Sequence, residues 1–201
     1  MKHEWKKQEK ELYGVKTKPV ILDVPSQKFI MISGRGNPND PAFSDKVGAL
    51  YSLAYAVKMG YKSAPTSSVI SDFTVYPLEG IWRLAEGTEL VKENLEYTIM
   101  IRQPDFITKE MVEKALEKIR IKKPNPLYED IRFDAMTDGN SVQILHAGSF
   151  DDEPASFEKM DQFLQAQGLE RFEGCHREIY LNNANRTEKS KLKTILRYLL
   201  K

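Results

Sequence analysis

One order of predicted elements occurs twice along the chain: a strand, an exit that contains glycine, an amphipathic helix, a strand that carries one glutamate, and a final strand. Internal repetition of this kind predicts a duplicated β-β-α-β-β-like unit. We place the pseudo-repeats at about residues 18–121 and 130–201, within a single domain of residues 1–201. Each unit would bury its helix against an antiparallel sheet, so we expect an α+β fold with a pocket at the seam between the halves.

Two periodicities locate the elements. Alternation of apolar and polar residues predicts strands at residues 18–24, 28–33, 71–84, 95–101, 131–136, 141–147, 175–181 and 192–200. Apolar residues three and four positions apart predict helices at residues 3–13, 41–60, 111–119 and 154–167. Gly60 and Gly168 are expected to end the second and the fourth of these helices. Pro124 and Pro126 make residues 122–129 the predicted linker between the halves.

Composition restricts the class of function. The chain has 201 residues, 41% of them hydrophobic, and a formal net charge of +1, which supplies a core but no charge excess that would attract nucleic acid. Its single cysteine, Cys175, excludes an internal disulfide and a cysteine-rich zinc site. The charged N-terminus does not resemble a signal peptide, and no stretch approaches the ~20 apolar residues of a membrane span. We therefore expect a cytoplasmic protein without a membrane partner.

Metal and cofactor sites are not predicted either. The three histidines, His3, His146 and His176, lack the spacing of metal ligands. The glycines Gly34 and Gly36 lack the spacing of a phosphate-binding loop, so they predict a plain strand-to-helix connection. We expect no cofactor.

The strand at residues 175–181 carries the first candidate site. Alternation places Glu178 and Tyr180 on one face of the strand and Arg177 and Ile179 on the other. Burial of an unpaired carboxylate is costly, so either this face meets water or Glu178 has a function. His176 lies near the same site, and Tyr180 is either a hydrogen-bonding partner or a packed strand aromatic.

The strand at residues 71–84 also carries one glutamate, Glu79, which suggests two carboxylates in related positions. Glu79 followed by glycine is equally consistent with a β-bulge. Trp82 offers a flat surface for a ligand or is an ordinary core indole, and Tyr76 lies in the same stretch.

The helix at residues 41–60 carries two further candidates. Tyr51 and Tyr55 lie four residues apart, beside the apolar stripe, and either flank the pocket or complete the packing.

Three short stretches resemble a known family. They are His176–Leu181, Leu192–Arg197 and Pro77–Trp82. The first two look like the C-terminal signature of the GyrI-like small-molecule-binding proteins, and the third resembles the motif in their N-terminal half. The resemblance covers roughly Lys18 to Leu200. The chain departs from the family at Asn183 and Ala184, where many members have Asp and Pro, which affects a loop at the rim of the cavity.

The resemblance implies a fold and a site. The fold would be two tandem SHS2-type modules, with an aromatic-lined, hydrophobic cavity at the seam and a glutamate in it that corresponds to Glu178. Members fused to a DNA-binding domain act as multidrug-sensing regulators, but this chain resembles a stand-alone member. Some stand-alone members hydrolyse the cyclopropane ring of DNA-alkylating natural products and so protect the cell.

These observations give a first hypothesis and two alternatives. The first hypothesis is a hydrolase of the cyclopropanoid type, with two catalytic residues and six ligand-binding residues: Glu178 and Tyr180, and Trp82, Glu79, Tyr51, Tyr55, Tyr76 and His176. The alternative is a non-catalytic protein that binds multiple drugs and uses Glu178 as a counter-ion. A weaker alternative is a protein inhibitor of a partner such as a topoisomerase. We expect a hydrophobic or cationic small molecule as the partner, and no obligate protein partner.

Overall fold

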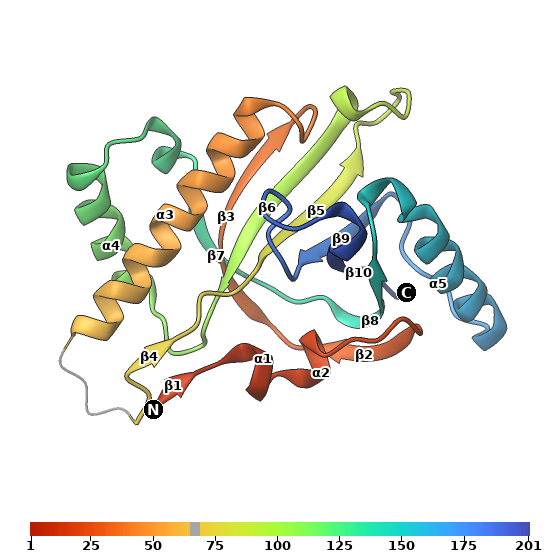
Figure 1. Ribbon diagram of the computed structural model, residues 1–201, viewed down its shortest axis with the longest axis horizontal. Coiled ribbons are helices and arrows are strands. Elements are labelled where there is room, and N and C mark those ends of the chain that lie inside the picture. Colours follow the sequence, from red (N-terminus) through yellow and green to blue (C-terminus); the bar gives the residue numbers. More distant parts are fainter. Residues whose placement is uncertain (65–68) are drawn as a thin grey trace.

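An eight-stranded, curled antiparallel sheet forms the centre of the computed structural model, which describes residues 1–64 and 69–201 (Figure 1). From one edge to the other, the strands are β2 (Val20–Val24), β8 (Gly139–Ala147), β10 (Lys193–Leu199), β9 (Cys175–Tyr180), β5 (Leu78–Leu84), β6 (Leu95–Gln103), β3 (Gln27–Arg35) and β7 (Arg132–Met136). A small parallel sheet pairs β1 (Lys2–His3) with β4 (Asp72–Phe73). The α+β fold is thus confirmed.

The strands of the two halves are arranged symmetrically about the centre of the sheet. Strands β8, β10 and β9 of the second half match β3, β6 and β5 of the first half, and β9 pairs with β5 at the centre. The first strand of each half crosses over, because β2 pairs with β8 and β7 pairs with β3. Each half therefore supplies the outermost strand of the other, while the repeat boundaries at residues 18–121 and 130–201 stay a prediction.

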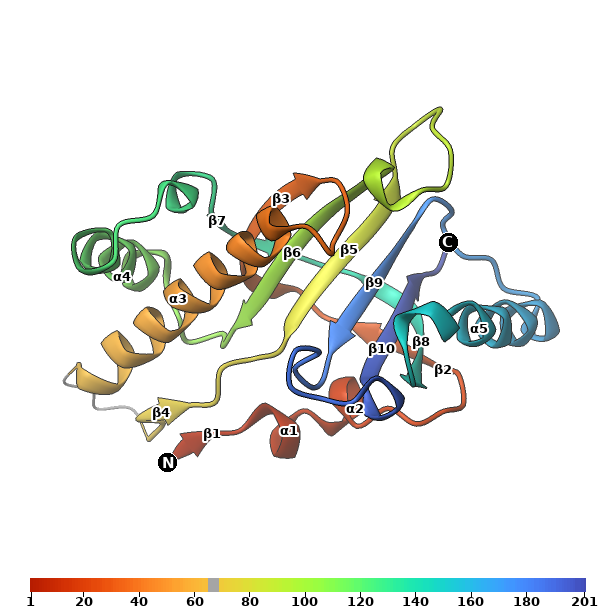
Figure 2. The same cartoon turned by 45° about the horizontal axis from the view of Figure 1, so that its top comes forward.

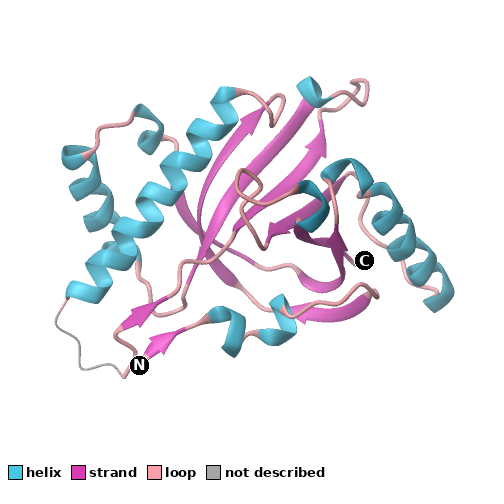
Figure 3. Cartoon of the chain, in the orientation of Figure 1, coloured by secondary structure: helices cyan, strands magenta, loops and turns pink. Residues whose placement is uncertain are grey.

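Two long helices lie on one face of the sheet. Helix α3 (Pro41–Ser63) packs on β3 and β6, and α5 (Pro154–Gln167) packs on β8. A further helix, α4 (Lys109–Lys122), packs against α3 (Figure 3). Their apolar periodicity follows from this packing, because each helix buries one stripe of side chains.

Gly60 does not end α3 as expected. The helix continues to Ser63, because Tyr61 is buried and its hydroxyl donates a 2.8 Å hydrogen bond to the Ile70 carbonyl. These contacts offset the ~1 kcal/mol that a glycine inside a helix costs. Gly168 does end α5, in the left-handed conformation at φ 65° that glycine adopts without strain.

The N-terminal segment differs from the predicted single helix of residues 3–13. It forms two short turns, α1 (Trp5–Gln8) and α2 (Lys10–Tyr13), that bury Trp5 and Tyr13. Glu9 breaks the helix between them, and its carboxylate accepts hydrogen bonds from Arg102 and Tyr76. Tertiary contacts have therefore overridden the helical pattern.

Two other predicted segments are interrupted. The strand expected at residues 71–84 is divided into β4 and β5, because Trp5 donates a 3.0 Å hydrogen bond from its indole nitrogen to the Val75 carbonyl between them. The expected linker at residues 122–129 includes the end of α4 and a 3₁₀ turn at Pro126–Glu129 with a buried Tyr128. Within residues 1–64 and 69–201, no helix combines the length and apolar character that a membrane crossing needs.

Candidate functional site

One row of residues crosses the middle of the sheet and contains Glu178. Residues directly opposite each other on antiparallel strands point to the same face. The pairing register gives the row as Ile32, Ile99, Gly80, Glu178, Leu196 and Ile144. Glu178 is the polar member of this row, and its side chain points to the face that carries α3 and α5.

The helices divide that face into two cores with Glu178 between them. Leu50 and Leu53 of α3 cluster with Ile99, whereas Met160 of α5 clusters with Leu196. Figure 2 shows β5 and β9 running between the two helices. We call this junction of β5 and β9 between α3 and α5 the seam.

Glu178 is held by two side chains of its own strand. The Tyr180 hydroxyl donates a 2.7 Å hydrogen bond to Oε2 of Glu178, and Nε2 of His176 lies 2.8 Å from Oε1. Alternation explains the arrangement, since residues 176, 178 and 180 share one face. Only 8% of Glu178 is exposed, so its charge is compensated by hydrogen bonds instead of by water.

Tyr180 connects Glu178 to Trp82 on the neighbouring strand. The indole nitrogen of Trp82 donates a 2.9 Å hydrogen bond to the Tyr180 hydroxyl. Burial raises the pKa of the Tyr180 phenol well above its usual range, and the Glu178 charge raises it further. Tyr180 therefore remains a neutral hydrogen-bond donor to the carboxylate.

Gly80 makes the Trp82 contact possible. A Cβ atom at position 80 would lie 2.6 Å from the indole nitrogen of Trp82, which is closer than van der Waals contact allows. The missing side chain lets the indole lie across β5 toward Tyr180, while Phe43 and Tyr97 pack against it with ring centroids 5.7 and 5.3 Å away. Gly80, which follows Glu79, thus allows the close approach of the Trp82 indole. Strand β5 pairs continuously with both neighbours at this position, without a β-bulge.

A second buried carboxyl group, which no sequence pattern predicted, interacts electrostatically with Glu178. Glu153 precedes α5, is 7% exposed, and its Oε1 has no hydrogen-bond partner among the described residues. Burial raises the pKa of Glu153 from its ordinary value of 4.5 to about 9, and the nearby charges of Glu178 and Asp151 contribute. An acidic residue before a helix is common, so the sequence carried no distinctive signal for this role.

We expect Glu153 to make stability fall as pH rises. Its folded-state pKa lies above the unfolded value, so the folded protein binds the extra proton between about pH 4.5 and 9 and loses that stabilisation across this window. The slope for one proton is at most about 1.4 kcal/mol per pH unit. Urea unfolding from pH 5 to 9 should show a steeper loss for the natural protein than for Glu153→Gln. Parallel curves would contradict the burial of a protonated Glu153, and Glu158→Gln on the next turn is the control.

Glu79 does not lie beside Glu178. It neighbours Gly80 in β5, so its side chain points to the opposite face of the sheet, where it lies 3.5 Å from Nη1 of Arg177. Burial raises the pKa of Glu79, and Arg177 opposes that rise. The hypothesis that both strand glutamates serve one site is not supported by this geometry.

Three of the tyrosines expected around the pocket, Tyr51, Tyr55 and Tyr76, lie in different places. Tyr76 is buried beside Trp5 and Arg102, and its hydroxyl donates to Glu9, so it belongs to the core under the N-terminal segment. Tyr51 is half-buried near the seam, where its hydroxyl bonds to the backbone of Leu78, the residue opposite Tyr180. Tyr55 is 54% exposed one turn further along α3.

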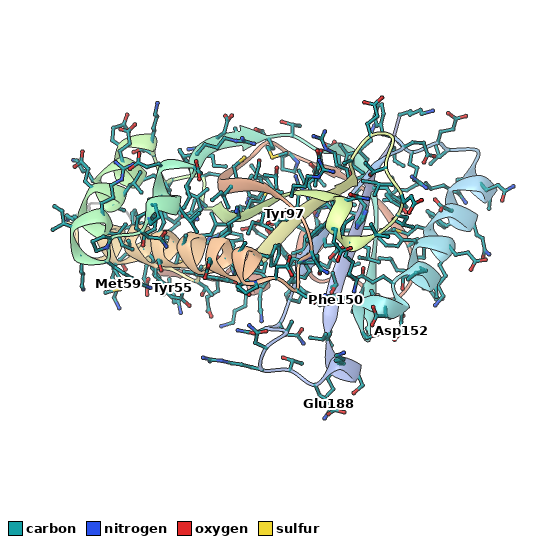
Figure 4. The ribbon with its side chains drawn as sticks, turned by 90° about the horizontal axis from the view of Figure 1, so that it is seen from above. Tyr55, Met59, Tyr97, Phe150, Asp152 and Glu188 are labelled. Carbon is teal, nitrogen blue, oxygen red and sulfur yellow. The ribbon has the colours of Figure 1, made fainter. Side chains whose placement is uncertain are left out.

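Several exposed side chains lie on the side of the sheet that carries the seam. Figure 4 shows Tyr55 and Met59 on α3, Phe150 and Asp152 in the turn before α5, and Glu188 in the β9–β10 loop, all on one side of the sheet. Phe150 is 41% exposed and meets the Tyr180 ring edge to face at 5.9 Å. Phe150 thus lies at the edge of the Glu178 network.

A groove of about 580 Å³ continues from the seam along α5. Its lining includes His176, Phe157, Tyr198, Pro154, Glu158, Asp161, Gln162 and Gln165. His176 thus faces the groove and contacts Glu178 behind it. Across residues 1–64 and 69–201, no group of three or more His, Cys, Asp or Glu side chains is placed to hold a metal ion.

Solved structures from Listeria innocua are similar over their whole length. An uncharacterized conserved protein is 35% identical, with a TM-score of 0.92 over 99% of this chain and 100% of that chain. A hydrolase is 34% identical, with a TM-score of 0.91 over 100% of both chains. The EcmrR C-terminal domain, at 12% identity and a TM-score of 0.55 over 92% of this chain and 97% of that one, shares only the fold.

The family assignment rests on nearly the whole chain. No curated protein matches this chain in sequence. The model of the GyrI-like small-molecule-binding domain, however, matches residues 17–199, which include both strands of the seam and both flanking helices. The chain belongs to the GyrI-like small-molecule-binding family.

Proposed function

We propose that this protein binds flat, apolar small molecules at the seam and hydrolyses a strained cyclopropane ring in them, as a protection against DNA-alkylating natural products. One observation carries the proposal. Glu178 is a buried carboxylate with fixed hydrogen bonds in the middle of an otherwise apolar row, between two helix-covered cores. The similar hydrolase from Listeria innocua supports an enzymatic role.

Glu178 would act as the general base. A carboxylate fixed in a partly dry site can take a proton from a water molecule as the oxygen attacks an electrophilic carbon. Tyr180 and Trp82 position Glu178 through the two-step hydrogen-bond chain, so the carboxylate needs no rearrangement during the reaction. Trp82 is 5% exposed between Phe43 and Tyr97, which suits it to this anchoring role better than to ligand stacking.

Aromatic side chains near the seam would supply ligand contacts. Tyr51 of α3 bonds to Leu78, and Phe150 of the turn before α5 contacts Tyr180. Tyr55 lies beside Tyr51, with ring centroids 6.5 Å apart, so the three rings give a flat apolar molecule surfaces to pack against. A ligand held there would place its strained ring toward Glu178.

Incubation with a cyclopropane-bearing alkylator tests the proposal. We expect mass spectrometry to detect a product heavier by one water molecule, formed faster with the protein than in buffer. A rate equal to that of buffer for a compound that demonstrably binds would overturn the enzymatic claim.

Binding without chemistry is the second candidate, because the family is described as small-molecule-binding. Glu178 would then be a counter-ion for cationic ligands. Two outcomes would support this candidate over the first: ligands recovered unchanged, and a Glu178→Gln variant that binds cations more weakly but neutral analogues equally well.

Tyr180→Phe tests the hydrogen-bond chain. Loss of the hydroxyl removes one partner of Glu178 and the acceptor of Trp82, so we expect a loss of about 1–3 kcal/mol in the free energy of unfolding and about tenfold or more in turnover. Urea unfolding and initial rates measure the two effects. Tyr55→Phe, which changes a side chain that is 54% exposed, should alter stability by less than about 0.5 kcal/mol. Equal losses of stability in the two variants would contradict a role for the hydrogen bonds of Tyr180.

A further inference from the structure

Two buried carboxyl groups influence each other electrostatically at the seam, but their hydrogen bonding differs. Both oxygens of Glu178 have side-chain partners, His176 and Tyr180. Glu153 is equally buried, yet its Oε1 has none among the described residues. An ionised, buried carboxylate without hydrogen-bond partners is strongly unfavourable. Glu153 therefore either holds a proton or binds a ligand.

Helix capping does not account for Glu153. Its backbone is already helical, at φ −57° and ψ −33°, and its side chain makes no capping hydrogen bond. The helix N-terminus alone would favour the ionised form. Burial and the Glu178 charge act in the opposite direction and are larger.

Three other carboxyl groups lie on the elements around Glu153: Glu178 of β9, and Asp151 and Asp152 of the preceding turn. The other titratable or charged groups there are His176 and Tyr180 of β9, His146 of β8, which bonds to Ser156 of α5, and Lys92, which pairs with Asp151 at 3.8 Å. Two carboxyl groups in one site separate their protonation states, because both cannot be ionised at low cost. Glu178, whose oxygens both have side-chain partners, is suited to accept a proton, whereas Glu153 is suited to hold one.

We propose that Glu153 is a second catalytic residue, a general acid that gives its proton to the leaving atom of the substrate while Glu178 accepts one from water. This role rests on the hydrolysis proposed above. It assigns the two carboxyl groups opposite functions on the basis of their different surroundings. The substrate class is a strained ring conjugated to a carbonyl group, because that carbonyl oxygen can receive the proton.

The reaction balances without any other reagent. The water oxygen forms a bond to a ring carbon, and the ring carbon–carbon bond breaks. Its electron pair moves through the conjugated system onto the carbonyl oxygen, which takes the proton of Glu153, while the proton of the water passes to Glu178. A proton transfer from Glu178 to Glu153, near the Tyr180 hydroxyl that interacts with both, restores the initial state.

Glu153→Gln tests this role in the whole protein. The amide keeps the size of the side chain but has no acidic proton, so turnover should fall about a hundredfold while KM changes little. Ring opening leaves an anion on the carbonyl oxygen. The loss of turnover should be largest for substrates in which this anion is most basic, and small for substrates in which it needs no protonation. The alkaline limb of the pH profile of kcat/KM should disappear. Glu113→Gln, in an exposed ion pair on α4, is the control and should leave the rate unchanged.

Carbon-13 NMR of the glutamate carboxyl groups gives a readout besides activity. We expect one signal, absent in Glu153→Gln, to remain that of a protonated carboxyl group at pH 7. Titration of that signal below pH 5 would overturn the role.

The outcomes separate this role from the proposed function. No turnover by the natural protein would overturn both. Turnover that survives Glu153→Gln at the natural rate, with the alkaline limb retained, would overturn only the assignment of Glu153. Circular dichroism confirms in each case that the variant is folded.

Discussion

Replacing Glu178 by glutamine is expected to lower hydrolytic turnover by about a hundredfold or more, while ligand affinity changes little. The amide keeps the size of the side chain and can still bond to Tyr180 and His176, so the seam should keep its shape. It cannot accept a proton from water. Initial rates by chromatography, together with ligand affinity by calorimetry, separate the two effects.

The control for this variant is Glu96→Gln. Glu96 belongs to the same sheet and pairs with Arg83 at 2.7 Å, but its side chain is 31% exposed and lies away from the seam network. We expect it to keep the natural rate. If Glu178→Gln hydrolyses at the natural rate, Glu178 is not the base, and Glu153 becomes the candidate for that role.

Replacing Asp138 by asparagine is expected to lower the free energy of unfolding by about 3–5 kcal/mol. Asp138 lies in the β7–β8 turn and contacts two buried guanidinium groups, Nη2 of Arg177 and Nη1 of Arg197, each at 2.9 Å. With Glu79 these residues form a neutral set of two acids and two bases, in which each side chain is at most 4% exposed. Removal of one charge leaves a buried guanidinium uncompensated.

Urea unfolding measures the effect of Asp138→Asn. The midpoint should fall without a change in the slope, since the same surface is exposed on unfolding. Asp105→Asn is the matched control, because its carboxylate lies 4.0 Å from Arg102 but is 78% exposed, where an ion pair contributes less than about 1 kcal/mol. Similar losses for the two variants would contradict the importance of the buried set.

Local patterns predicted the elements that they directly determine. Alternation located the strand of Glu178 and placed Glu178 and Tyr180 on one face, as the structure shows. Helical periodicity predicted α5 with its observed bounds. These features depend on the geometry of a few consecutive residues, which a sequence displays.

Features that depend on distant residues were missed. The separation of Glu79 from Glu178 follows from a pairing register that sets Gly80, not Glu79, opposite Glu178. The approach of Glu153 to Glu178 depends on how the turn before α5 packs on the sheet. Tyr76 is buried by the N-terminal segment, whose contacts no periodicity reveals. The functional assignments of the site residues stay predictions until the variants are measured.

The exchange of outer strands bears on how such a chain evolves. Because β2 lies against the second half and β7 against the first, loss of either half would take away the other's outermost strand. An ancestral half would then expose an open edge that invites aggregation. Once interlocked in this way, the two halves are free to diverge in sequence, yet they are inherited as one unit. Divergence without separation permits the glutamates of the two central strands to differ in place, Glu178 on the face that carries the helices and Glu79 on the opposite face.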